Sequence, residues 1–312
     1  YGVICNLSPI FCRFIYFNDN TILSETGEDY LISNINSPDD YGGCHPLDVC
    51  YNTIQNKLYF YGGQNIIIVD ALTNTKIKEI KVSETFNYSY SNMFSRKDNH
   101  YLEYNPKYNK VFCATLSSDL VIIDCSTDEI INVINTPEIT NFHSTSVLLD
   151  FSGDFLYWYV NDYFTSRYLN KIDCQTNNRV LQRVFSPGIF DIELNPIGSI
   201  LYMSTYCNSN NKIHAINTSN LQTIIEFGKP EIGEMVIDGV TNRIYVDNLE
   251  SGQVLVYDLT TYIQVDAIDV FFDDVSQGAF NSSENLIYFT GYNQTTLNAG
   301  LSIIDGTTGN EV

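Results

Sequence analysis

The chain has 312 residues, of which 44% are hydrophobic and 13% aromatic, including 23 tyrosines. Lys and Arg number 16 against 37 Asp and Glu, so the formal net charge is −21 at pH 7. Such a surface repels phosphate backbones and anionic lipid, so we expect no nucleic-acid partner. No apolar run approaches the ~18 residues that span a bilayer, so we expect no membrane insertion.

The chain begins at Tyr1 instead of Met and has no charged-then-apolar leader, which favours a processed chain or a fragment of a longer protein. Its eight cysteines include no C-x-x-C pair, so a structural zinc cluster is not expected. We therefore expect no cofactor, apart from the divalent metal considered below.

The first 46 residues predict four short strands, with the weakest pattern in the chain: Gly2–Asn6, Arg13–Phe17, Thr21–Glu25 and Tyr30–Asn34. Residues 47–82 contain four clearer runs of strand length. These runs are rich in β-branched and aromatic residues and are bounded by Asn, Gly and Thr, which favours strands over helices.

This four-strand unit recurs along the chain. An aromatic residue in the middle of the second strand marks each copy, at intervals of 53, 45, 45, 43 and 43 residues: Tyr59, Phe112, Tyr157, Tyr202, Tyr245 and Tyr288. Seven residues before each marker lies an Asn or Asp, here called the first-strand Asx: Asn52, Asn105, Asp150, Asn195, Asp238 and Asn281. Four strands per period of 40 to 50 residues are typical of a β-propeller.

The third strand of each copy also ends on an Asn or Asp, here called the third-strand Asx: Asp70, Asp124, Asp173, Asn217, Asp258 and Asp305. These side chains can accept a hydrogen bond from the backbone two residues on and so close an Asx-turn. We therefore interpret both sets as hairpin-turn residues and not as catalytic carboxylates.

The repeat resembles the YVTN family of β-propeller repeats, a WD40-like architecture. The resemblance covers residues 47–312 and is carried by Asn105-Pro106, Asn195-Pro196, Ile244-Tyr245-Val246, Ile67-Ile68-Val69-Asp70 and Thr73-Asn74. We predict one all-β domain over 1–312, a propeller of seven four-stranded antiparallel blades, with six blades and an N-terminal extension as the alternative. The expected blades are approximately 1–35, 47–82, 102–137, 146–186, 190–228, 233–270 and 276–312. Residues 2–6 could instead pair into the last blade.

Long connections between strands are the expected place for recognition. Two of them, Ser83–Tyr101 and Tyr159–Arg167, are rich in aromatic residues and are expected on the same face of neighbouring blades. Exposed aromatic clusters mark recognition surfaces, although a long loop can also bury its own aromatics. The candidate ligand-binding residues are Phe86, Tyr88, Tyr90, Phe94, Tyr159, Tyr163 and Phe164.

A second candidate site is polar. His45, His143, Glu231 and Asp274 each lie seven residues before a first-strand Asx, just ahead of the first strands that line a propeller's channel. Imidazole and carboxylate groups on such a ring could hold a divalent metal or serve as general base and acid. The alternative is a set of solvated loop residues.

The resemblance to YVTN repeats implies a surface-layer or cell-surface protein. We therefore expect a secreted or surface-displayed binding or structural propeller that recognises protein or glycan, and not an enzyme. Related propellers include quinoprotein dehydrogenases and lactonases, but the only tryptophan is Trp158, and no nucleophile elbow or phosphate loop is present. The alternative is a metal-assisted hydrolase or lactonase acting at the mouth of the channel.

Overall fold

The structure is a computed structural model that describes only part of the chain. It gives the backbone of 3–5, 14–18, 21–25 and 29–34, and then 48–62, 64–82, 100–136, 142–162, 167–186, 188–206, 212–229, 232–248, 251–272, 274–293, 296 and 298–312. Side chains are described from residue 48 onward, without those of 142–144, 162, 206 and 274–276.

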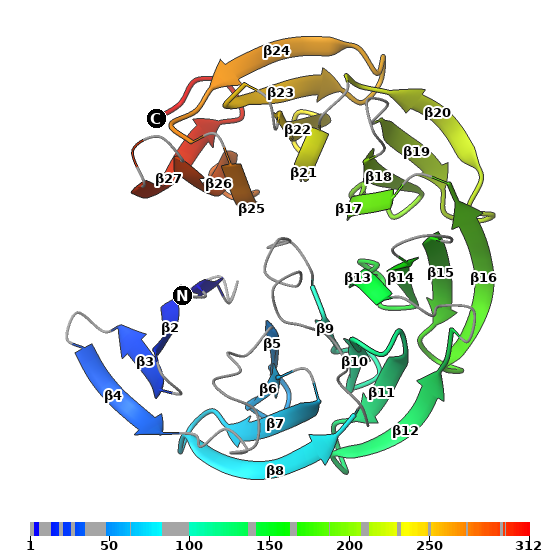
Figure 1. Ribbon diagram of the computed structural model, residues 1–312, viewed down its shortest axis with the longest axis vertical. Helices are drawn as coiled ribbons and strands as arrows, with labels where there is room; N and C mark the ends of the chain where they lie inside the picture. Colours follow the sequence, from blue (N-terminus) through cyan, green and yellow to red (C-terminus); the bar gives the residue numbers. More distant parts are fainter. Residues whose placement is uncertain are drawn as a thin grey trace. The chain divides into compact units, whose positions relative to one another are not determined.

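Every regular element among the described residues is a β-strand, and each strand pairs antiparallel with its neighbour in sequence. The result is a series of small sheets of consecutive strands, a propeller-like all-β fold (Figure 1). The first sheets are β1 (Val3–Cys5), β2 (Phe14–Asn18), β3 (Thr21–Glu25) and β4 (Asp29–Asn34); β5 (Asp48–Asn52), β6 (Lys57–Tyr61), β7 (Asn65–Asp70) and β8 (Thr75–Lys81); and β9 (Leu102–Asn105), β10 (Lys110–Ala114), β11 (Leu120–Asp124) and β12 (Glu129–Ile134).

The remaining sheets follow the same order. They are β13 (Phe142–Leu149), β14 (Phe155–Asp162), β15 (Arg167–Asp173) and β16 (Asn178–Phe185); β17 (Gly188–Leu194), β18 (Ile200–Tyr206), β19 (Ile213–Asn217) and β20 (Thr223–Phe227); β21 (Ile232–Asp238), β22 (Arg243–Asn248), β23 (Gln253–Asp258) and β24 (Gln264–Asp269); and β25 (Asp274–Asn281), β26 (Leu286–Asn293) and β27 (Asn298–Asp305). In the last sheet a fourth strand only begins, through an isolated bridge between Ile304 and Glu311. The predicted four-strand repeat is therefore confirmed, while the number of blades and the closure of a ring stay predictions.

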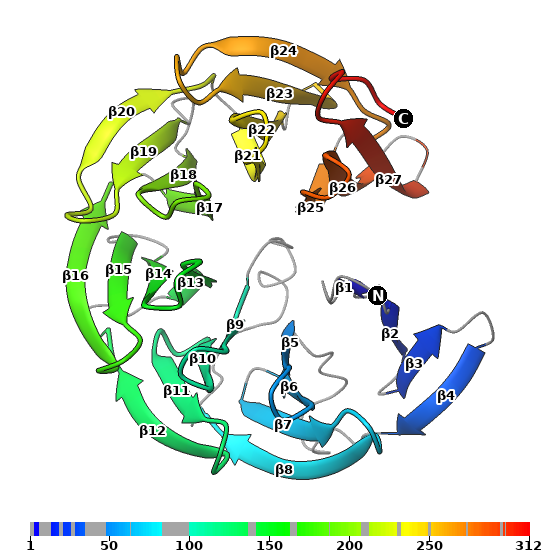
Figure 2. The same ribbon diagram turned by 180° about the vertical axis from the view of Figure 1, so that it is seen from behind.

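The chain divides into two compact units. Unit 1 consists of Tyr1–Tyr88, His100–Pro137 and Cys174–Asn178, and unit 2 consists of Ser89–Asn99, Glu138–Asp173 and Arg179–Val312. Within unit 2 the first strands of successive sheets lie along one edge and the fourth strands along the other, as Figure 2 shows from behind. Strand β17 contacts β21, and β21 contacts β25, so the sheets of this unit pack in chain order.

Most residues of both Asx sets close Asx-turns as predicted, whereas Asp150 and Asn195 accept the backbone N–H groups of Phe155 and Ile200, five residues on. Asn52 Oδ1 accepts the backbone N–H groups of Ile54 and Gln55 at 2.9 and 3.0 Å. In the third-strand turns, Asp258 Oδ1 accepts those of Thr260 and Thr261 at 2.9 and 2.8 Å. These hydrogen bonds favour the ionised carboxylate and lower the pKa of Asp258 below its usual range. The same effect lowers the pKa of Asp70, Asp124 and Asp305.

Four residues after each third-strand Asx, the backbone enters the left-handed region. This turn-closing residue is Asn74, Asp128, Asn177, Leu221, Tyr262 or Gly309. Asn, Asp and Gly tolerate a positive φ, but Leu221 (φ 57°) and Tyr262 (φ 59°) do so only at a cost of roughly 1–2 kcal/mol. Both side chains pack between neighbouring sheets of unit 2: Leu221 is buried beside Tyr157 and Phe185, and the ring of Tyr262 lies 5.1 Å from that of Phe227. Packing between sheets offsets the local strain.

In unit 1 the turn-closing residues Asp128 and Asn177 make polar contacts with the preceding sheet. Lys57 Nζ donates to Asp128 Oδ2 at 2.7 Å, and the Tyr59 hydroxyl donates to Asp128 Oδ1 at 2.7 Å. Lys57 Nζ also donates to the carbonyl oxygen of Cys125 at 3.1 Å. One turn further along the chain, Lys110 Nζ donates to Asn177 Oδ1 at 2.8 Å. Each lysine thus binds the turn of the next sheet.

The marker aromatics form the core between sheets. The five from Tyr59 to Tyr245 are fully buried. In unit 2, one face of each sheet packs against the next sheet: Ile213 of β19 clusters with Ile244 and Leu255 of the following sheet. Four residues before the third-strand Asx, five sheets carry a side chain with 0% exposure: Ile66, Leu120, Leu169, Ile213 and Val254.

The last sheet departs from this pattern. Leu301 occupies the same repeat position in β27 but is 55% exposed. The marker Tyr288 is only half-buried, unlike its five counterparts. The described residues therefore leave one face of the β25–β27 sheet uncovered at Leu301 and Tyr288. In every other sheet from β5 onward, the side chains at these two repeat positions are buried.

Candidate functional site

The four residues predicted to hold a metal are largely outside the described part of the chain. His45 and Glu231 fall among the residues that are not described. His143 lies inside β13 and Asp274 begins β25, so both belong to first strands and do not precede them, and their side chains are not described. Among the side chains that are described, no group of three or more His, Cys, Asp or Glu residues is placed to hold a metal ion. The metal site stays a prediction.

Most of the predicted ligand-binding aromatics also lie outside the described residues: Phe86, Tyr88, Tyr90, Phe94, Tyr163 and Phe164. The exception is Tyr159, which the structure places in the core and not in an exposed loop. Strand β14 pairs with β13 and β15 along its length, because the aromatic and β-branched run from Phe155 continues past Tyr159. The Tyr159 ring is buried, and its hydroxyl donates to the carbonyl oxygen of Phe190 at 3.0 Å.

The structure instead shows a set of carboxylates on the first strands that bind the backbone of the next sheet. Asp48, Asp191 and Glu234 share one repeat position, four residues before their first-strand Asx. Each accepts a hydrogen bond from the backbone of the next sheet's first strand. The donors at Leu102, Met235 and Gly278 also share one position, three residues before the Asx of the following sheet.

Asp48 makes the most complete set of contacts, within unit 1. Its Oδ2 accepts the N–H groups of Tyr101 and Leu102 at 2.7 and 2.8 Å, and its Oδ1 accepts that of Val49 at 2.7 Å. Burial raises the pKa of Asp48 above its usual range, although His100 and these hydrogen bonds oppose the shift. A carboxylate held by three backbone donors is an anchor between two sheets and is poorly placed to act as a nucleophile.

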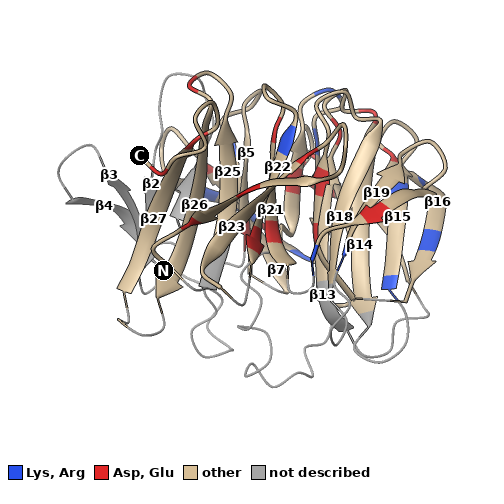
Figure 3. Ribbon diagram, turned by 90° about the horizontal axis from the view of Figure 1, so that it is seen from above, with Lys and Arg blue, Asp and Glu red and all other residues tan. Residues whose placement is uncertain are grey.

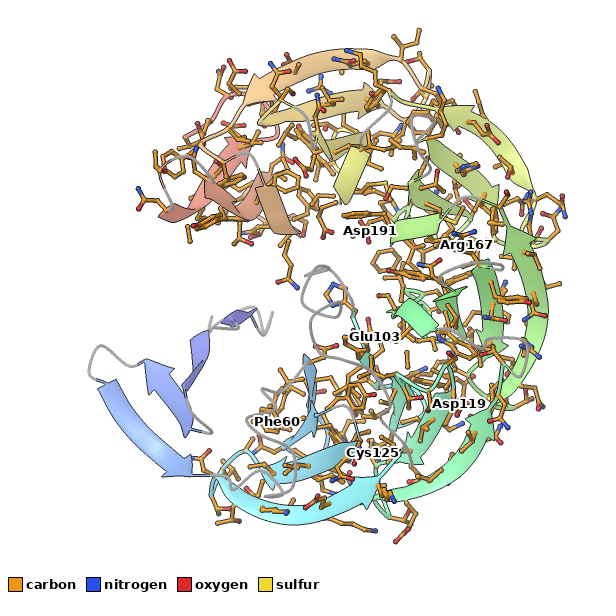
Figure 4. The ribbon with its side chains drawn as sticks, viewed as in Figure 1. Phe60, Glu103, Asp119, Cys125, Arg167 and Asp191 are labelled. Atoms are coloured by element: carbon orange, nitrogen blue, oxygen red, sulfur yellow. The ribbon has the colours of Figure 1, made fainter. Side chains whose placement is uncertain are left out.

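Asp191 and Glu234 repeat the arrangement in unit 2. Asp191 Oδ2 accepts the N–H of Met235 at 2.9 Å, and its Oδ1 accepts that of Ile192 at 2.7 Å (Figure 4). Glu234 Oε1 accepts the N–H of Gly278 at 3.3 Å. Burial raises the pKa of Glu193 well above its usual range, and the neighbouring charge of Asp191 raises it further. Glu193 is therefore placed to retain its proton at a higher pH than an exposed carboxyl.

Irregular pairing accounts for the two anchors of unit 2. The first strands β21 and β25 each carry a register shift, between Ile232 and Met235 and between Val275 and Gln277. A bulge leaves backbone groups of the ladder without their usual partner, and a buried N–H without an acceptor is costly. In unit 2 a carboxylate from the preceding sheet supplies an acceptor beside each of these shifts.

Sequence reasoning missed these anchors, although their signal was present. The repeat register that identified the Asx residues also aligns Asp48, Asp191 and Glu234. Acidic residues are depleted in strands, so an acidic residue at one fixed position in three of six repeats indicates a specific contact.

No protein-family model matches this chain, and no curated protein matches it. The resemblance to YVTN repeats therefore stays a prediction. None of the described residues forms a helix long and apolar enough to cross a bilayer.

Proposed function

We propose that this protein is a non-enzymatic binding or structural propeller, secreted or displayed on a cell or particle surface, that recognises a protein or a glycan. In this proposal the repeats close into a ring of seven blades. Recognition falls to the connections that leave the strands at the end opposite the Asx-turns.

The observation that carries the proposal is where the charged strand residues make their contacts. Asp48 and Asp191 bind backbone N–H groups of the next sheet, and Lys57 and Lys110 bind its turn. Groups that could have served chemistry are engaged in joining sheets. A scaffold of this kind supports recognition on its loops, as is usual for folds whose framework is rigid.

The uncovered face of the last sheet supports closure of the ring. In unit 2, the residue equivalent to Leu301 packs against the following sheet, as Leu169 does against Leu201 and Val254 against Ile287. A face that exposes Leu301 and half-exposes Tyr288 would gain about 25 cal/mol per Å² of apolar surface on being covered. A further sheet of the same repeat is the matching cover.

The candidate recognition residues are the loop aromatics Phe86, Tyr88, Tyr90, Phe94, Tyr163 and Phe164. Aromatic side chains supply large, rigid contact area to protein and to sugar rings alike. Tyr159 is not included, because its ring is already buried between sheets.

A glycan array and a panel of purified surface proteins, probed with the full chain, test the proposal. We expect a specific ligand whose binding falls about tenfold or more when Tyr88 and Phe94 are both changed to Ser. Circular dichroism of the variant, compared with the parent, verifies that the sheets remain intact.

An enzymatic result would overturn the proposal. Hydrolysis of lactone or ester substrates that is abolished both by a chelator and by His143→Ala would identify a metal-assisted hydrolase instead. Metal analysis of protein purified without chelator or affinity tag then identifies the ion.

A further inference from the structure

Three successive sheets of unit 2 expose a large apolar side chain at the turn between their first and second strands. Phe151 is 73% exposed, Ile197 82% and Val240 61%. These turns do not need apolar residues, because each is closed by its first-strand Asx and by Gly153, Gly198 or Asn242 in the left-handed region. Turn positions favour Gly, Asn, Asp, Ser and Pro, so three exposed hydrophobic side chains in a row are unusual.

The three turns lie close to one another. A Cβ atom on Gly239 would approach Pro196 Cγ to 2.5 Å, so the turns that carry Val240 and Ile197 touch. Lys171 links the sheet of Phe151 to the next sheet, because its Nζ donates to the carbonyl oxygen of Thr218 at 2.9 Å. The Thr218 hydroxyl in turn donates to the carbonyl oxygen of Gly198 at 2.8 Å. We call Phe151, Pro196, Ile197 and Val240 the turn-end patch.

Fixed negative charge lies at the same end of the strands. In the strand register, Asp258 lies opposite Arg243 and Asp305 lies opposite Leu286. Arg243 and Leu286 are the first residues of their second strands, so both carboxylates lie beside turns between a first and a second strand. Asx-turn hydrogen bonds hold both carboxylates ionised, and neither is buried. Figure 3, in which Asp and Glu are red, shows acidic residues in several turns at the ends of the strands. Two cations lie near these turns: Arg243, whose charge also lowers the pKa of Asp258, and Lys171, whose Nζ lies over the ring of Phe155, 3.8 Å from its centroid.

We propose that the turn-end patch binds a protein partner through a basic segment that carries large apolar side chains. The apolar side chains of the segment cover Phe151, Ile197 and Val240, and its Lys or Arg residues pair with Asp258 and Asp305. Charge complementarity of this kind sets specificity and association rate, while the apolar contact supplies affinity. This surface lies at the opposite end of the strands from the loops of the proposed function, so the two proposals stand or fall separately.

Synthetic peptides test the proposal on the full chain. The probes are a 14-residue peptide that alternates Leu and Lys and two matched peptides, one alternating Ser and Lys and one alternating Leu and Glu. We expect the Leu–Lys peptide to bind in fluorescence anisotropy, and the other two to bind at least about tenfold more weakly. The variant Phe151→Ser/Ile197→Ser/Val240→Ser is expected to lose about tenfold or more in affinity for the Leu–Lys peptide.

The matched control is Val184→Ser, which removes an exposed hydrophobic side chain from β16, away from the turns. It is expected to leave peptide binding unchanged. Equal binding of the Ser–Lys and Leu–Lys peptides would overturn the proposal, because net charge alone would then explain the attraction. Unchanged binding by the triple Ser variant would also overturn it. Binding to neutral phosphatidylcholine vesicles that the triple variant loses would assign the patch to a lipid surface instead.

Discussion

Units 1 and 2 join neighbouring sheets at the same turn but place different side chains at its left-handed position. In both, the turn after the third strand reaches the preceding sheet through its turn-closing residue, at nearly the same backbone angle: φ is 56° at Asp128 and 57° at Leu221. In unit 1 the Asp128 side chain contacts Lys57 and Tyr59, whereas in unit 2 the Leu221 side chain packs in a hydrophobic cluster around Tyr157. The backbone of the unit 2 turn still binds cations, because Lys171 and Arg183 donate to the carbonyl oxygens of Thr218 and Leu221. Backbone geometry is thus shared between the units, while the polarity of each contact is set by its partner on the facing sheet.

Moving the unit 1 residue into unit 2 is the strongest test of this comparison. Leu221→Asp suits the left-handed backbone but places a carboxylate in an apolar cluster. We expect it to lower the free energy of unfolding by about 4 kcal/mol, measured by guanidinium denaturation of the full chain. Asn220→Asp, at the exposed neighbouring position, is the control and should change stability by less than about 0.5 kcal/mol. A small effect of Leu221→Asp would mean that the cluster does not depend on this residue.

The reverse exchange in unit 1 should cost less and should be reparable. Asp128→Leu leaves Lys57 Nζ and the Tyr59 hydroxyl without their shared carboxylate, and we expect a loss of about 2–3 kcal/mol. Adding Lys57→Met removes the stranded charge and should restore most of the stability, since apolar replacements of buried ion pairs are often neutral or better. If the double variant is less stable than Asp128→Leu alone, the two chemistries are not exchangeable.

The first-strand carboxylates Asp48 and Asp191 differ between the units in the number of backbone N–H groups that they accept. Asp48 binds two N–H groups of the next sheet, whereas Asp191 binds one. We expect Asp48→Ala to cost about 2 kcal/mol and Asp191→Ala about 1 kcal/mol, since each orphaned buried donor carries a penalty. Hydrogen exchange should accelerate at Leu102 in the first variant and at Met235 in the second. Acceleration spread evenly over all sheets would argue against a local anchoring role.

The Asx-turns should behave alike in both units, with the smallest effect. The folded-state pKa of Asp70, Asp124, Asp258 and Asp305 is lowered, so their contribution to stability is present above the unfolded pKa of about 3.9 and is lost as pH falls through the folded pKa. Asn occupies this position naturally at Asn217 and keeps the acceptor oxygen. Urea unfolding at pH 7 and pH 3 should therefore show a weaker acid dependence for Asp70→Asn/Asp124→Asn and for Asp258→Asn/Asp305→Asn. A difference between the two pairs would show that the turns are not equivalent.

Local features of this fold were readable from the sequence, and contacts between sheets were not. The Asx-turns were predictable because donor and acceptor lie within three residues of each other, as at Asp258 and Thr261. The anchor at Asp48 was not predicted, because its donors lie more than fifty residues away in the sequence. Leu221 and Tyr262 carry no local sign of a left-handed turn, since only packing against the preceding sheet makes that conformation tolerable. Tyr159 was misplaced because the end of a strand depends on its neighbours as well as on its own residues.

The order of strands in each sheet has a consequence for synthesis of the chain. Each strand pairs with the one made just before it, so a complete sheet needs only about 45 residues and no segment from a distant part of the sequence. Contacts of such short range keep contact order low, which favours fast folding for a β protein. As the chain leaves the ribosome, each new sheet of unit 2 can pack against the apolar face of the sheet that formed before it. While the last sheet is still uncovered, its exposed Leu301 is the point where misassembly between chains would begin.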